Sequence, residues 1–118
     1  HALRGVRAAV EIQRALTRWN AERWEKGLPA VIARIALNSG PVVVGDIGSN
    51  RRVDYTVLGN TVNVAARLEQ AVARPGEVVI GAETFRMLGG EIATEALGEV
   101  QLKGLQQKIT AYRVVLPA

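Results

Sequence analysis

The 118-residue sequence has no cysteine, and its single histidine, His1, is the first residue. The missing cysteines exclude disulfides, thiolate metal sites and cysteine nucleophiles, and they fit a reducing compartment. One terminal histidine supports neither a Ser-His-Asp triad nor a histidine-based metal site. Because the chain starts with His1 and not with methionine, we expect it to begin inside a longer protein.

Aromatic residues and long apolar runs are also scarce. No run approaches the roughly 20 apolar residues that span a bilayer, and no signal peptide is recognisable. The formal net charge is +4, which raises nucleic-acid binding as a possibility. However, the basic residues are dispersed, and no aromatic residues are interleaved with them as a stacking platform requires. We therefore predict no nucleic-acid partner, and attribute the charge to phosphate handling or to an arginine-rich solvated surface.

The chain is long enough for one domain with a real core. Residues 1–26 predict one long helix, ended by Gly27 and Pro29. Its apolar stripe predicts packing on a sheet, although a basic amphipathic helix on a membrane surface is the alternative. The stripe consists of Leu3, Val6, Ala9, Val10, Ile12, Leu16 and Trp19.

The remaining pattern mixes strands and helices, which predicts an α+β fold. Strands are expected at 31–37, 41–44, 77–80, 92–97, 98–104 and 109–115, and a short helix at 82–88. Residues 38–40 and 89–90 read as turns, and 45–50 as a loop. Asp46 in that loop is interpreted as turn chemistry.

The central stretch, residues 53–69, predicts a strand, a turn and a helix. Residues 53–58 alternate as in a strand, Gly59 breaks it, and Asn60 is a good N-cap for a helix that ends near residue 73. On that helix Asn63 and Arg67 are four residues apart and can reach the same ligand. An amide and a fixed cation suit a phosphorylated substrate. The alternative is an ordinary solvated helix face.

These segments together resemble a known family. Residues 34–48 (RIALNSGPVVVGDIG), 54–69 (DYTVLGNTVNVAARLE) and 97–104 (LGEVQLKG) are similar to the class III nucleotidyl cyclase catalytic domain, and residues 1–10 to its helix after the metal-binding segment. The resemblance covers essentially the whole chain in the family's order. It implies the C-terminal portion of a bacterial-type adenylate cyclase domain, with a partial ferredoxin-like fold and a mainly antiparallel sheet flanked by helices.

The resemblance also implies a reaction and residue roles. The family converts a nucleoside triphosphate to the 3′,5′-cyclic monophosphate and pyrophosphate, in a site between two catalytic domains arranged head to tail. Asn63 would orient the ribose, and Arg67 would hold the charge developing on the reacting phosphate. Thr56 matches the base-reading position, where threonine indicates ATP, and Lys103 matches a contact to the triphosphate.

One part of the family pattern is absent. The two aspartates that bind two Mg²⁺ or Mn²⁺ ions, and the base-reading lysine, lie upstream of the first helix in the family. Asp46 and Asp54 stand at positions the family does not use for metal, so no metal ligand is assigned in this chain. We expect residues 1–118 to form one incomplete catalytic domain that is inactive alone.

Several expectations follow for the longer parent protein. Its partners would be ATP and a second cyclase domain in a head-to-tail homodimer. This domain would face the cytoplasm and make no direct membrane contact. Two alternatives remain open: a catalytically silent cyclase-like domain that binds a nucleotide or a partner, and a guanylate cyclase.

Overall fold

The computed structural model describes residues 1–41, 51–105 and 108–117, with the backbone alone over 51–59. Its elements mix helices and strands, which confirms the predicted α+β class. In chain order they are α1 (Ala2–Glu25), β1 (Ile35–Leu37), α2 (Arg51–Ala71), β2 (Val78–Gly81), α3 (Ala82–Leu88), β3 (Thr94–Val100) and β4 (Ile109–Val114). No helix in the described ranges combines the length and apolar character needed to cross a membrane.

The four described strands form one mixed sheet in the order β1-β2-β4-β3. Strand β1 runs parallel to β2, with Leu37 beside Ile80. The pairings of β4 with β2 and with β3 are antiparallel, so the described sheet is mainly antiparallel, as expected. A register shift near Gly98, whose φ is 83°, interrupts the β3–β4 ladder. The two strands expected at 92–97 and 98–104 are thus a single bulged strand in the structure.

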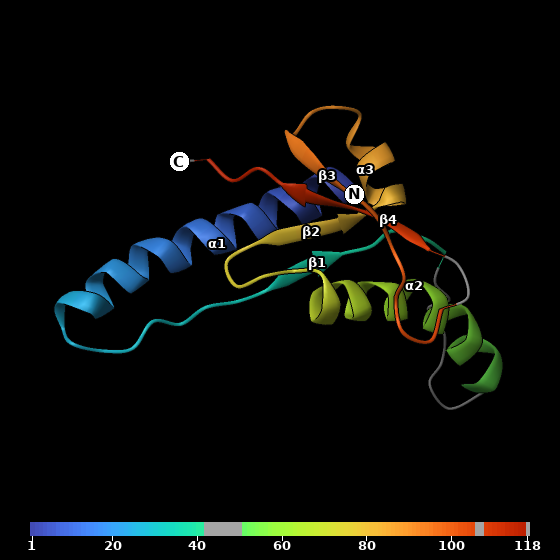
Figure 1. The fold of residues 1–118 in the computed structure, drawn as a ribbon, viewed down its shortest axis with the longest axis horizontal. Coiled ribbons are helices and arrows are strands. Elements are labelled where there is room, and N and C mark those ends of the chain that lie inside the picture. Colours follow the sequence, from blue (N-terminus) through green and yellow to red (C-terminus); the bar gives the residue numbers. More distant parts are fainter. Residues whose placement is uncertain (42–50, 106–107, 118) are drawn as a thin grey trace.

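Helices cover both faces of this sheet (Figure 1). Because strand side chains alternate, β2 contributes to a separate core on each face. Val78 and Ile80 pack with Val6, Ala9 and Leu88 on the side of α1 and α3. On the other side, Val79 joins the cluster of α2, whose buried members are Val64, Leu68, Ala73, Val79, Leu102 and Ala111.

Helix α1 matches its predicted bounds and its predicted end. Gly27 has a φ of 71°, its N–H donates to Trp24 O, and the N–H of Leu28 donates to Arg23 O. This pair of bonds is a Schellman cap. The predicted apolar stripe is only partly right, because Ile12 and Trp19 are exposed and the buried face instead carries Gln13, beside Val6 and Ala9.

The expected strand over 53–58 is wrong, because these residues lie within helix α2. Gly59 and Asn60, predicted as strand breaker and N-cap, are interior helix positions. The apolar residues of this stretch also fit helical spacing, since Val53 and Val57 are four apart, so periodicity alone is ambiguous. A helix closes its own hydrogen bonds, whereas a strand needs a neighbour, and none of the described strands pairs with this stretch. An interior glycine costs such a helix about 1 kcal/mol.

The other predicted elements are largely confirmed. The strand expected at 77–80, the helix at 82–88 and the strand at 109–115 correspond to β2, α3 and β4. Gly89 ends α3 in the left-handed conformation, with a φ of 58°. The strand expected at 31–37 is shorter, since β1 covers three residues. The strand at 41–44 and the loop at 45–50 fall almost entirely on residues 42–50, outside the described residues.

Candidate functional site

Helix α2 carries two of the predicted site residues on a well-anchored platform. Val64 is 6% and Leu68 0% exposed, and both belong to the core between α2 and the sheet. Asn63 and Arg67 each precede one of these anchors. Asn63 is exposed and Arg67 is partly buried. The four-residue spacing therefore sets both polar side chains along one edge of the buried face.

The turn that contains Lys103 lies against Arg67. A Cβ atom built on Gly104 would stand 3.8 Å from Nη2 of Arg67. The turn is anchored by Leu102, which is 2% exposed, and is closed by a 3.1 Å hydrogen bond from the Leu105 N–H to Leu102 O. Lys103 itself is exposed. The structure thus brings together two segments that are far apart in sequence, one carrying Arg67 and the other the turn of Lys103.

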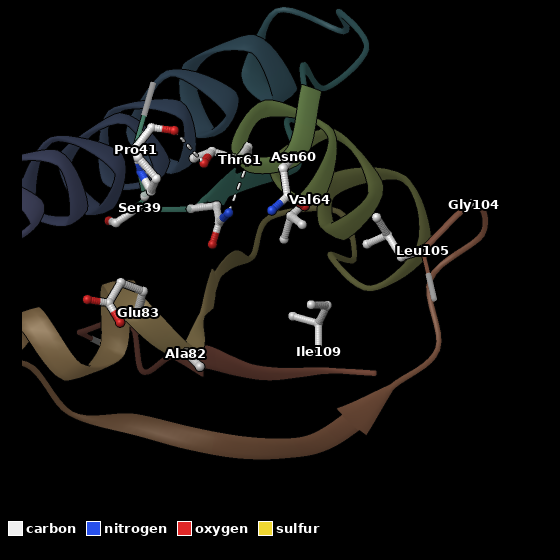
Figure 2. Close-up of a pocket in the computed structure, with 12 residues that line it drawn as sticks. Ser39, Pro41, Asn60, Thr61, Val64, Ala82, Glu83, Gly104, Leu105 and Ile109 are labelled. Carbon is white, nitrogen blue, oxygen red and sulfur yellow. Dashed lines mark hydrogen bonds between the residues drawn. The ribbon is translucent and has the colours of Figure 1, made fainter. Parts of the chain in front are cut away.

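A cleft of about 650 Å³ runs beside α2 toward this turn (Figure 2). Helix α2 borders the cleft with Asn60, Thr61 and Val64, whereas the predicted residues Asn63, Arg67 and Lys103 are not among its lining residues. Gly104, which borders the cleft, is also the residue that Arg67 Nη2 approaches from α2. The volume is in the range of small-molecule sites. The lining residues are Asn38, Ser39, Gly40, Pro41, Asn60, Thr61, Val64, Ala82, Glu83, Gly104, Leu105 and Ile109.

A polar cluster closes the other end of the cleft, and sequence reasoning missed it. Asn38 Nδ2 donates to Thr61 O at 3.1 Å, and the hydroxyls of Ser39 and Thr84 lie 2.8 Å apart. Thr84 is 1% exposed, so this bond satisfies a buried hydroxyl. The cluster forms where the parallel strands β1 and β2 end side by side. That pairing was the missing signal, because residues 38–40 alone read as a turn.

Glu83 contributes a negative charge to the cleft wall. A hydrogen bond from the Arg86 side chain lowers the pKa of the Glu83 carboxyl below its ordinary value. The pair lies on successive turns of α3 and is exposed to solvent. The carboxylate therefore remains ionised at neutral pH, at the end of the cleft away from Gly104 (Figure 2).

Ion pairing distinguishes structural arginines from those of the candidate site. Arg113 is bound by Glu77 at 3.0 Å and by Glu95 at 2.6 Å, and Arg34 by Glu69 at 3.1 Å. Within the ranges that the structure describes, neither Arg67 nor Lys103 forms an ion pair. A cation without a carboxylate partner suits an incoming anion, because no existing pair has to be broken first.

Two other expectations are not resolved by this geometry. The side chain of Thr56 lies outside the described residues, so its base-reading role stays a prediction. Among the residues with described side chains, no three of the types His, Cys, Asp and Glu lie close enough together to hold a metal ion. We therefore assign no metal ligand among these described residues, and no step below is assigned to a metal.

Comparison with known proteins agrees with the resemblance found in the sequence. The model of the adenylate and guanylate cyclase catalytic domain matches residues 1–115. Adenylate cyclase 1 of Rhizobium meliloti is 31% identical over 116 residues, which are 98% of this chain and 17% of that protein.

Solved structures of cyclases share the fold. The adenylyl cyclase CyaB from P. aeruginosa superposes with a TM-score of 0.83 at 28% identity, over 99% of this chain and 60% of that one. The guanylate cyclase domain of RhGC from Catenaria anguillulae, in complex with GTP, gives 0.74 at 29% identity, over 100% of this chain and 61% of that one. This chain thus spans a small part of its full-length relative and about three fifths of the solved domains. It belongs to the adenylate and guanylate cyclase catalytic domain family.

Proposed function

We propose that the protein containing this chain converts ATP to 3′,5′-cyclic AMP and pyrophosphate. One observation carries the proposal: Arg67 on α2 lies against the turn of Lys103, with Nη2 3.8 Å from the Cβ position of Gly104. Family membership supplies the reaction class. Arg67 and Lys103 would offer two cations to a phosphate chain. Helix α2, which carries Arg67, also carries Asn63.

Each of these residues has chemistry suited to a separate task. In the reaction the ribose 3′ oxygen attacks the α-phosphorus and pyrophosphate leaves, so negative charge develops on the transferred phosphoryl oxygens. The planar guanidinium of Arg67 can donate two parallel hydrogen bonds to those oxygens. Asn63 would orient the ribose through its amide, which both donates and accepts. The mobile ammonium of Lys103 would hold the triphosphate as a point charge.

The preference for ATP over GTP rests on Thr56. The relatives do not decide it, because an adenylyl cyclase and a guanylate cyclase are almost equally similar in sequence, at 28% and 29% identity. A threonine hydroxyl donates and accepts hydrogen bonds, so it can pair with the adenine edge. Threonine at this position is typical of bacterial-type adenylate cyclases, by the resemblance described above.

The site proposed here is incomplete within these 118 residues. By resemblance, the aspartates for two Mg²⁺ or Mn²⁺ ions come from a segment outside this sequence and from the other member of a head-to-tail homodimer. We propose that residues 1–118 form one incomplete catalytic domain without activity of its own. We also propose that the site faces the cytoplasm, because its proposed substrate, ATP, is found there.

The test is turnover by the complete protein with ATP and with GTP, in wild type and in Arg67→Ala. Removing a donor aimed at developing charge costs about 10²–10³ in kcat. The matched control is Arg74→Ala, which deletes an exposed arginine seven residues along the chain and should leave kcat within about twofold.

Each outcome of that test bears on a specific part of the proposal. An Arg67→Ala enzyme within about twofold of wild type would refute the assigned role. Faster turnover of GTP than of ATP would refute the base preference. No turnover of either nucleotide in the presence of Mn²⁺ or Mg²⁺ would favour the silent, nucleotide-binding alternative. Cyclic AMP formed by purified residues 1–118 would contradict the proposed incompleteness.

A further inference from the structure

Two hydrogen bonds tie helix α2 to the chain that follows β1. Asn38 Nδ2 donates to Thr61 O at 3.1 Å, and Thr61 Oγ1 donates to Pro41 O at 2.9 Å. Both bonds meet at one helical residue, and Figure 2 shows Thr61 beside Pro41. A carbonyl oxygen has two lone pairs, so Thr61 O can accept from Asn38 and still serve the helix.

Two glycines make room for these side chains. A Cβ atom on Gly81 would stand 2.5 Å from Asn38 Oδ1, and one on Gly40 would stand 2.6 Å from Thr61 Oγ1. Gly81 has a φ of −83° and a ψ of 174°, an extended conformation open to any residue. Its lack of a side chain is therefore explained by space for the Asn38 carboxamide and not by backbone freedom. The missing side chains of Gly81 and Gly40 thus leave space for Asn38 and Thr61, respectively.

The two hydrogen bonds at Thr61, called the tie below, supply the directionality that the apolar contacts of α2 lack. Val64 and Leu68 hold the helix on the sheet by burial, which is non-directional and tolerates small rotations. Hydrogen bonds at Thr61 fix rotation and register, because they weaken steeply with misalignment. Asn63 and Arg67 follow Thr61 on the same rigid helix, so a rotation at Thr61 moves both of them relative to the Lys103 turn.

We propose that Asn38 is a positioning residue, whose carboxamide sets the orientation of α2 and thereby aims Asn63 and Arg67. This inference rests on the proposed function, since it assigns Asn38 a task in the same site. Asn38 acts through α2, and nothing in the proposal requires it to touch the nucleotide. A misplacement of catalytic side chains by about 1 Å can lower the rate about 10²-fold, so loss of the Asn38 hydrogen bond should measurably lower kcat.

The central experiment is a double-mutant cycle in the complete protein with Asn38→Asp and Arg67→Ala. Asn38→Asp keeps size and shape but replaces the donor to Thr61 O with an acceptor. We expect kcat to fall about 10- to 100-fold at saturating ATP, with KM within about threefold. If Asn38 works through α2, the same substitution costs clearly less in the Arg67→Ala background than in wild type, because only its effect through Asn63 remains.

Equal, multiplicative losses in both backgrounds would overturn the proposal, because Asn38 would then act independently of Arg67. So would a wild-type kcat in Asn38→Asp. The comparison variant is Asn20→Asp, which makes the same amide-to-carboxylate change on α1 and should leave kcat unchanged, because Asn20 does not line the cleft. Its Nδ2 donates to Val31 O at 2.8 Å, so this control also loses a side-chain bond to a backbone carbonyl.

A second cycle tests the tie without any assay of turnover. Gly81→Ala should lower the thermal midpoint of the complete protein, because the new methyl collides with the Asn38 carboxamide. In an Asn38→Ala background the same substitution should cost clearly less. Equal shifts in both backgrounds would refute the seating of Asn38. This cycle reports on Asn38 even if the proposed nucleotide chemistry is wrong, so the two failures are distinguishable.

Discussion

Gln13 offers a quantitative test of how the α1 layer is held. It is 4% exposed, and its Nε2 donates to Ala33 O and to Glu77 O, both at 3.0 Å. Each carbonyl also accepts a backbone hydrogen bond. Gly76 N–H donates to Ala33 O at 2.9 Å, and Ile35 N–H donates to Glu77 O at 3.2 Å. Loss of the glutamine therefore leaves neither carbonyl without a partner.

The expected cost of Gln13→Met follows from that arrangement. Two net hydrogen bonds at about 1 kcal/mol each give about 2 kcal/mol, while methionine retains most of the packing volume. If the carbonyls were left unsatisfied, the cost would be higher by about 1–3 kcal/mol for each of them. The free energy of unfolding comes from urea titration followed by far-UV circular dichroism.

The control is Arg14→Met, the same replacement one position along α1 at an exposed residue. It breaks only a 3.6 Å surface contact to Glu11, so we expect a change within about 0.5 kcal/mol. A loss below about 0.5 kcal/mol for Gln13→Met would show that its bonds add nothing net. A loss above about 4 kcal/mol would show that the backbone donors do not satisfy the two carbonyls.

Two further predictions concern α2 and α3. Leu68→Ala should lower the free energy of unfolding by about 2–5 kcal/mol, because Leu68 is fully buried in the core under α2. The control is Trp24→Ala, at a side chain that is 83% exposed, which should change the free energy of unfolding by less than about 0.5 kcal/mol. Glu83→Gln should be less stable than wild type at neutral pH. Since Arg86 lowers the folded-state pKa of Glu83 below the ordinary 4.5, that difference should persist above pH 4.5 and close as the pH falls through the folded-state pKa. Acid titrations of both proteins measure it, and a difference that survives in strong acid would contradict the assignment.

Only part of the candidate site could be predicted from the sequence. Asn63 and Arg67 could be found because helical spacing alone brings them together, and α2 indeed carries both. Their relation to the Lys103 turn could not be found from spacing, because it depends on how Leu102 is buried under α2. Thr56 was predicted on a strand, and its backbone is instead part of α2. An apolar run that fits two periods does not choose between them.

The elements with local signals could be predicted from the amino-acid sequence alone. Strong helix formers with a glycine terminus predicted α1 and α3, a buried β-branched run predicted β2, and a partly buried strand pattern predicted β4. The order of motifs indicated the family. Local propensity and short-range periodicity suffice there, because each element's preference agrees with its final environment.

Which segments meet in space could not be predicted from the sequence and became clear from the folded arrangement. The parallel pairing of β1 with β2 brings Asn38 beside Gly81, and packing of α2 on the sheet brings Thr61 to Asn38 and Arg67 to Gly104. Such contacts between distant residues depend on burial and on the closing of long loops. Gln13 shows the same limit: one buried amide in an apolar stripe is meaningful only once the carbonyls of Ala33 and Glu77 lie beside it.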